Sequence, residues 1–290
     1  MKCVAVANTM LASILALPVL AQPAAASSDG YETPNWRIQL DAGKTHYSAR
    51  EVGTTGQLLN RESGLLLTET VTGTYVQDQW SWQISWEHLH DTVPYDGVTQ
   101  TGVPITTQSR ILANRYSALT HCAWITQPDW SLAPLLGLEQ FQLDRTIAAT
   151  PPSPPSLPLG TQALQEVLTT RRAILGLSAK WMPPKQAWTL TAGVQMMPSW
   201  HQSLKVNTYG TYDEKSLRPG HSTDWRLNLS AAYPWSPQTL LTANWTRESF
   251  KPGASGTEAL TKNGIPSASI QYPGSQQFLS GIKFGVLFLF

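Results

Sequence analysis

Acidic and histidine side chains with the potential for acid–base chemistry cluster in two polar segments of the chain. The first segment carries His88, His90, Asp91 and Asp96, and the second carries His201, Asp213, Glu214 and His221. A histidine next to a carboxylate can remove a proton from water and so promote hydrolysis. Asp91, Asp96, Asp213 and His221 are therefore the catalytic candidates, provided that the fold brings the segments together. The alternative is that they only keep surface loops soluble, as most exposed charged residues do.

Other chemical motifs are absent from the sequence. It contains no glycine-rich phosphate loop, no zinc-ligand spacing and no Gly-x-Ser-x-Gly nucleophile elbow. We therefore expect no metal ion and no cofactor. The net charge of +1 gives no indication of nucleic-acid binding.

The elements that position these residues are predicted to be membrane-spanning strands. In the last stretch of the chain, the even-numbered residues from Phe278 to Phe290 include four phenylalanines, whereas Lys283 lies on the opposite face. Such a face on a soluble edge strand would cause aggregation, but lipid would cover it. Charged residues are only 13% of the chain, and no run of 18 apolar residues follows the N-terminal segment. The pattern favours a β-barrel over transmembrane helices.

Ten stretches show a strand pattern, which predicts an all-β fold, an antiparallel up-and-down transmembrane β-barrel of ten strands. The clearest are 36–42, 80–87, 188–197, 225–233 and 278–290, and the weaker ones are 65–76, 110–125, 130–142, 171–181 and 239–247. Short connections alternate with long ones at roughly 46–64, 89–109, 143–170, 198–223 and 248–276. Outer-membrane barrels have short turns in the periplasm and long loops outside. In the second strand Glu69 shares a face with Leu67 and Val71, so we expect either that this face is luminal or that a bulge changes the phase.

Tryptophans gather beside the predicted short turns, as in an aromatic girdle at a membrane interface. The periplasmic girdle is expected to contain Trp36, Trp80, Trp124, Trp130, Trp181, Trp188 and Trp235. A second belt is expected to include Tyr47, Trp86, Trp200, Trp225 and Trp245.

The alternation also assigns charged side chains to the interior of the barrel. The inward positions are Arg37, Asp41, Glu87, Arg226 and Lys283, with Arg115, His121, Glu139, Arg172 and Lys180 as further candidates. A ten-stranded barrel is narrow enough to be filled by side chains. We expect these charges to form an ion-pair network, with Lys283 directed toward Arg37 and Asp41. A conduction path is the alternative.

The N-terminus has the layout of a cleaved signal peptide. Lys2 precedes an apolar run, and cleavage fits either after Ala24-Ala25-Ala26 or after Val19-Leu20-Ala21. We therefore expect residues 1–26 to be removed and residues 27–290 to form a single barrel domain in the bacterial outer membrane. Outer-membrane lipids, lipopolysaccharide and, during insertion, the barrel-assembly machinery are the expected partners.

The strand count and the penultimate hairpin, from Ala231-Ala232-Tyr233 to Thr242-Ala243-Asn244-Trp245, resemble the omptins, the ten-stranded outer-membrane proteases. The resemblance implies a pair of aspartates two residues apart in one loop and an Asp-x-His in the opposite loop. Here Asp91 and Asp96 are five apart, and Lys215 stands where the histidine of Asp213-Glu214-Lys215 would be. This departure argues against protease activity.

Three functions follow from the sequence. The first is a non-enzymatic barrel whose extracellular loops bind at the cell surface. The alternatives are a narrow porin-like channel or transporter and an omptin-like protease. The sequence does not identify the surface ligand.

The aromatic face of the last strand, Ile282, Phe284, Val286, Phe288 and Phe290, resembles the signal that the barrel-assembly machinery reads. We predict that deletion of Phe290, or its replacement by a charged residue, leaves precursor or unfolded protein in the periplasm. Cell fractionation checks this, and normal outer-membrane insertion of the variant would refute it.

Overall fold

The computed structural model describes residues 35–53, 56–98, 104–149, 163–183 and 186–290, and confirms the all-β, ten-stranded antiparallel barrel. The ten barrel strands are β1 (Trp36–Val52), β2 (Leu58–Gln77), β3 (Trp80–Val98), β4 (Pro104–Cys122), β6 (Trp130–Ile147), β7 (Leu164–Trp181), β8 (Thr189–Asn207), β10 (Thr223–Ser236), β11 (Thr239–Phe250) and β14 (Ser275–Leu289). Among the described residues, no helix has the length and apolar composition needed to cross a bilayer. The predicted signal peptide, residues 1–26, lies outside the described residues.

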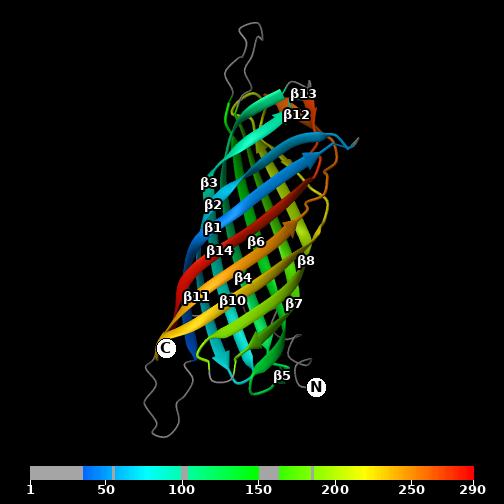
Figure 1. The fold of residues 1–290 in the computed structure, drawn as a ribbon. Coiled ribbons are helices and arrows are strands. Elements are labelled where there is room, and N and C mark those ends of the chain that lie inside the picture. The colour runs from blue at the N-terminus through cyan, green and yellow to red at the C-terminus, as the bar shows by residue number, and fades with distance from the viewer. Residues whose placement is uncertain (1–34, 54–55, 99–103, 150–162, 184–185) are drawn as a thin grey trace.

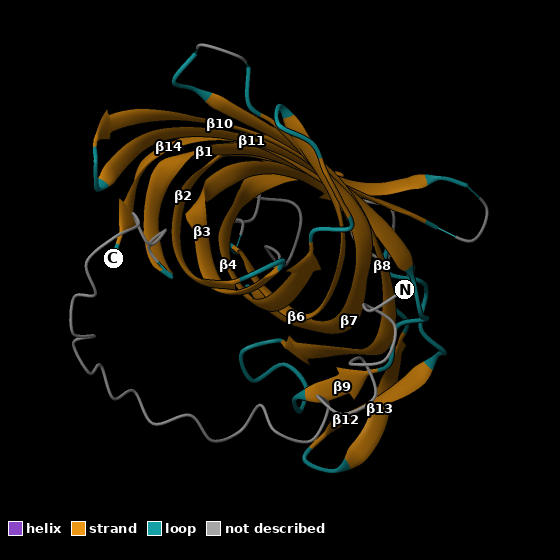
Figure 2. Ribbon diagram, turned by 90° about the horizontal axis from the view of Figure 1, so that it is seen from below, coloured by secondary structure: helices purple, strands orange, loops and turns teal. Residues whose placement is uncertain are grey.

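The first and last strands close the ring (Figure 2). β14 pairs antiparallel with β1 over fifteen residues, from Arg37 opposite Leu289 to Glu51 opposite Ser275, and with β11 on its other side. Four short elements complete the structure. β5 (Ile125–Thr126) pairs with β6 and β9 (Lys215–Leu217) pairs with β8, whereas β12 (Glu258–Lys262) and β13 (Ile265–Ile270) form a separate hairpin. The β12–β13 hairpin lies at the end of the barrel opposite the C-terminus (Figure 1).

The periplasmic half of the barrel follows the predicted alternation. Ile84 is 69% exposed and Phe284 66%, whereas the inward Glu87 on β3 is 8% exposed. The seven tryptophans of the predicted periplasmic girdle lie at or beside the strand ends nearest the short turns. Outward aromatic rings also stack there, with Tyr75 between Trp36 and Trp82 at 4.9 and 5.8 Å. Lipid-facing apolar residues thus cover this half of the barrel.

In the extracellular half the same strand positions face inward, but the inward residues become apolar and the outward ones polar, which corrects the predicted loop boundaries. On β3 the residues Leu89, Val93 and Tyr95 are buried inside, whereas His90 and Asp96 lie on the wall. The strands have up to 20 residues, so they run about 45 Å along the barrel axis and extend beyond an apolar band of about 25 Å. Because water surrounds this half, its apolar face turns inward. Most of the predicted loop between 89 and 109 is therefore strand.

Two predictions about outward positions were wrong. Glu69 lies on the outer face of β2 with Leu67 and Val71, while the alternate threonines Thr68 and Thr70 are buried, and the β1–β2 register is continuous here. Neither a luminal face nor a bulge accounts for it. Tyr47, expected in the second aromatic belt, is 1% exposed and lies inside the barrel, because the phase of β1 turns Ala49 and Tyr47 inward together.

Candidate functional site

Eight charged side chains cross the lumen near its middle. Four basic groups meet four acidic groups from seven strands: Arg115, Arg172, Arg226 and Lys283 with Glu87, Glu139, Asp224 and Glu248. No side chain among them is more than 12% exposed. Formal charges balance within the group, which we call the luminal ion network. Burial of these charges is tolerated because each one has partners of opposite sign.

Glu248 on β11 and Arg172 on β7 are the most connected members. Glu248 accepts hydrogen bonds from Arg172 Nη2 at 2.5 Å, from Arg115 Nη2 at 2.6 Å and from Arg226 Nε at 3.0 Å. Arg172 also donates to Glu139 at 2.6 Å and to Asp224 at 2.8 Å. The Arg172 guanidinium lies 5.3 Å from the centre of the Phe250 ring, a cation–π contact. The network is therefore held by hydrogen bonds and also packs against aromatic side chains of the lumen.

The space that remains between the network side chains is small. A cavity lined by Glu87, Arg115, Glu248 and Lys283 has a volume of about 10 Å³. This is the minimum needed for one water molecule. The network side chains therefore pack closely around this cavity.

The structure brings three of the five predicted luminal residues together. Glu87, Arg226 and Lys283 belong to the network, but Lys283 donates to Glu87 at 2.7 Å and to Thr70 at 2.9 Å rather than pointing to Arg37 and Asp41. Asp41 instead accepts from Thr242 and Asn244, each at 2.9 Å. No ion pair joins Arg37 or Asp41 to a described residue. The stagger between strands decides these pairings, and the sequence alone does not give it.

Sequence reasoning missed Glu248 and Asp224. A signal for Glu248 exists, since counting in twos along β11 from Asn244 places Thr246 and Glu248 on the inner face. The prediction ended that strand at residue 247. Both omissions come from strand ends drawn too short.

Above the network, apolar side chains fill the extracellular half of the lumen. Leu89, Ile111, Phe141, Leu168 and Phe250 belong to one buried cluster, and Phe141 and Phe250 meet edge to face at 5.7 Å. Leu217 of β9 and Tyr272 of the last extracellular connection join this cluster. The connections therefore insert side chains into the opening that they surround.

A second charged cluster closes the top of this core. Arg145 on β6 donates to Glu51 at 2.6 Å and to Glu166 at 2.9 Å, with Glu62 at 3.4 Å. Residues on the outer wall beside it, such as Arg50, Arg61 and Asp144, are charged, so this level lies outside the membrane. Burial raises the pKa of Glu51 and of Glu62 above the ordinary value, and Arg145 opposes that rise. Three carboxyls thus surround one guanidinium, and we call this cluster the Arg145 cap.

The four catalytic candidates do not form an acid–histidine site. Asp213 accepts from Thr261 Oγ1 at 2.6 Å and from the Gly264 amide at 3.0 Å, and these hydrogen bonds hold its pKa below the ordinary value. Asp96 accepts from Thr106 at 3.1 Å, and Asp91 from the amide of Thr92 at 2.7 Å. His221 is exposed. In the part of the chain that the structure describes, no histidine forms an ion pair with a carboxylate.

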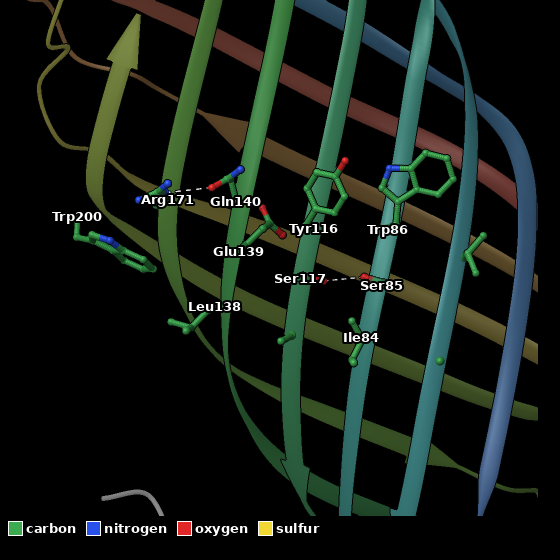
Figure 3. A pocket seen from close by; sticks show the side chains of 13 residues that line it. Ile84, Ser85, Trp86, Tyr116, Ser117, Leu138, Glu139, Gln140, Arg171 and Trp200 are labelled. Atoms are coloured by element: carbon green, nitrogen blue, oxygen red, sulfur yellow. Dashed lines mark hydrogen bonds between the residues drawn. The ribbon is translucent and has the colours of Figure 1, made fainter. Parts of the chain in front are cut away.

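The outer wall carries a shallow groove of about 660 Å³ (Figure 3). Apolar Ile84 and Leu138 lie on its periplasmic side, and Trp86, Tyr116, Gln140, Arg171 and Trp200 lie on its extracellular side. Arg171 Nε donates to Gln140 at 3.0 Å. The groove thus spans the boundary between the apolar band and the polar wall.

Comparison with solved structures places this fold among outer-membrane barrels. The outer-membrane protease OmpT of Escherichia coli has a TM-score of 0.62 and 12% identity, covering 91% of this chain and 100% of its own. The translocator domain of the autotransporter NalP of Neisseria meningitidis has a TM-score of 0.44 and 10% identity, with 90% of each chain covered. No protein-family model matches the sequence, and no curated protein matches it either. The chain therefore has an outer-membrane β-barrel fold that resembles the fold of OmpT.

Loss of Arg172 should destabilise the barrel strongly, because Glu139, Asp224 and Glu248 would lose a buried partner. We predict that Arg172→Ala lowers the free energy of unfolding by about 3–5 kcal/mol. The matched control Lys205→Ala removes an exposed pair with Glu214 at 3.6 Å and should cost about 0–1 kcal/mol. Urea unfolding of the barrel in detergent measures both, and equal effects would contradict the structural role of the network.

Proposed function

We propose that this protein is a non-conducting, non-enzymatic outer-membrane barrel that acts at the cell surface through its extracellular wall and connections. The observation that carries the proposal is the filling of the lumen at two levels. The luminal ion network blocks the middle, and the apolar cluster with the Arg145 cap blocks the extracellular half. A solute would have to displace both layers to pass.

The surface that remains for binding lies outside the barrel. The strands extend beyond the apolar band, and their outer face there is polar, with Arg50, Arg61 and Asp144 among its residues. The β12–β13 hairpin adds an exposed platform, on which Ile265 is 68% exposed. Asp213 fixes the position of this hairpin, because it accepts hydrogen bonds from Thr261 and from the Gly264 amide. This architecture suits a display scaffold.

Lipopolysaccharide is the membrane partner that we propose for the groove in Figure 3. Acyl chains would lie against Ile84 and Leu138, and an anionic headgroup would meet Arg171 at the extracellular side. Trp86 and Trp200 lie at the two lateral ends of the groove, and their rings suit the interface between acyl chains and headgroup. The aromatic and cationic groups are thus arranged as an amphiphilic ligand requires.

Hydrolysis is the second candidate, because the solved structure with a TM-score of 0.62 is a protease. Its chemistry would need a general base near Asp96, Asp213 or His221. Asp213 accepts three hydrogen bonds from the β12–β13 hairpin, which disfavours this candidate.

Planar-bilayer recording tests the non-conducting barrel. We expect no discrete conductance steps from the purified protein, because the luminal ion network and the apolar cluster above it occupy the lumen. Incubation with basic peptides should give no cleavage. Discrete steps would overturn the proposal in favour of a channel. Cleavage that is lost in Asp96→Asn, Asp213→Asn or His221→Ala would establish the hydrolase instead.

Lipopolysaccharide should raise the unfolding temperature of the detergent-solubilised barrel. We expect Arg171→Ala to reduce this stabilisation at least several-fold, because it removes the cation of the groove. Arg110→Ala changes an exposed arginine outside the groove and should leave the stabilisation unchanged. If both variants respond like the original protein, the groove is not the lipopolysaccharide site.

A further inference from the structure

We propose that His88, His90 and Glu69 on the outer wall form a binding site for a divalent transition-metal ion. The two histidines are two residues apart on β3 and project from the same face, with ring centres 5.1 Å apart. Zinc binds an imidazole nitrogen at about 2.0–2.1 Å, so two imidazoles held by one ion at a tetrahedral angle have ring centres about 5 Å apart. The spacing of the pair already matches that of two ligands on one ion.

The neighbouring strand prepares His88 for this role. Asn114 on β4 lies directly opposite His88, and its Oδ1 is 2.9 Å from His88 Nδ1. The same oxygen also accepts from Trp86 Nε1 at 3.4 Å, which identifies it as the acceptor. His88 Nδ1 therefore carries the proton, and Nε2 keeps its lone pair for an ion. Donation of the second ring N–H to a fixed oxygen is the usual support of a metal-binding histidine.

Stacking further restricts the rings. Trp86 and His88 stack with ring centres 5.8 Å apart and an angle of 25° between the planes. His90 follows in the same row, between the outward positions of Leu67 and Leu112 on the adjacent strands. An ordered pair loses less side-chain entropy when it binds an ion.

Glu69 supplies the third ligand from the other side. It lies directly opposite His88 on β2, so their Cβ atoms are about 4.5–5.5 Å apart. Among the described residues, no three histidine, cysteine or acidic side chains already lie at metal-binding distance from one another. Binding of the ion therefore requires the Glu69 side chain to rotate toward the two histidines. A site of this kind explains why a carboxylate stands between Leu67 and Val71 on an otherwise apolar outer face.

The donor set selects the class of ion. Imidazole favours zinc, copper and nickel over magnesium and calcium. Two histidines and one carboxylate leave the fourth tetrahedral position open to water.

Calorimetric titration of untagged full barrel in detergent with zinc chloride tests the site. We expect one ion per barrel, and at least tenfold weaker binding in His88→Ala and in His90→Ala. Glu69→Gln and Asn114→Ala should each weaken binding about tenfold. Asn114→Asp keeps an acceptor oxygen and should restore it, which a purely structural role of Asn114 would not predict. Cobalt should give the visible absorption of a tetrahedral ion.

His46→Ala is the matched control, because His46 is an exposed outer-wall histidine whose Nε2 contacts Ser63 at 3.1 Å. Its binding should equal that of the original protein. The proposal is overturned if no zinc binds, if the His88 and His90 variants bind as well as the original protein, or if His46→Ala weakens binding equally. Heat-modifiable mobility on gels verifies that each variant is folded.

Discussion

A charge buried at the middle of a narrow ten-stranded barrel cannot reach bulk water, so its burial is costly unless it is paired there. This constraint accounts for the charge balance of the network, four basic groups against four acidic ones. It also accounts for the convergence of seven strands on one level, because a single hairpin could not satisfy a guanidinium that needs several acceptors. Arg172, with no exposed side-chain surface, meets three carboxylates from three different strands. The network thus connects parts of the chain that are far apart in sequence.

The solvent outside the barrel sets the rest of the architecture. Where lipid surrounds the wall, apolar residues face outward, and polar or charged ones face the lumen. Where water surrounds it, the same strands reverse the pattern, as Glu87 and Leu89 show within three residues of β3. The luminal ion network lies near the level at which the inward residues change from charged to apolar, and the apolar cluster begins above it. Each long strand therefore has one part with the residue pattern of a membrane protein and another part with the pattern of a soluble protein.

This change in the polarity of the two faces also explains why only part of the fold could be predicted from the sequence. The alternation of Ile282, Phe284 and Lys283 is imposed by lipid on one side, and it predicted the last strand and the ring closure correctly. The segment around Leu89 and Val93 follows the opposite rule, so it resembled a loop. Pairings such as Lys283 with Glu87 depend on the stagger of strands, which no local pattern contains. Asp213 has the residue type of a catalytic group, but its hydrogen bonds to a distant hairpin, visible only in three dimensions, give it a structural role.

A double-mutant cycle between Arg172 and Glu248 tests most directly whether paired luminal charges hold the barrel together. The free energy of unfolding is measured for the original protein, for Arg172→Ala, for Glu248→Ala and for the double variant. The account predicts a coupling of at least about 1.5 kcal/mol, because each single variant deprives the other charge of its buried partner at 2.5 Å. Effects that add within about 0.5 kcal/mol would contradict it, since independent sites behave in that way.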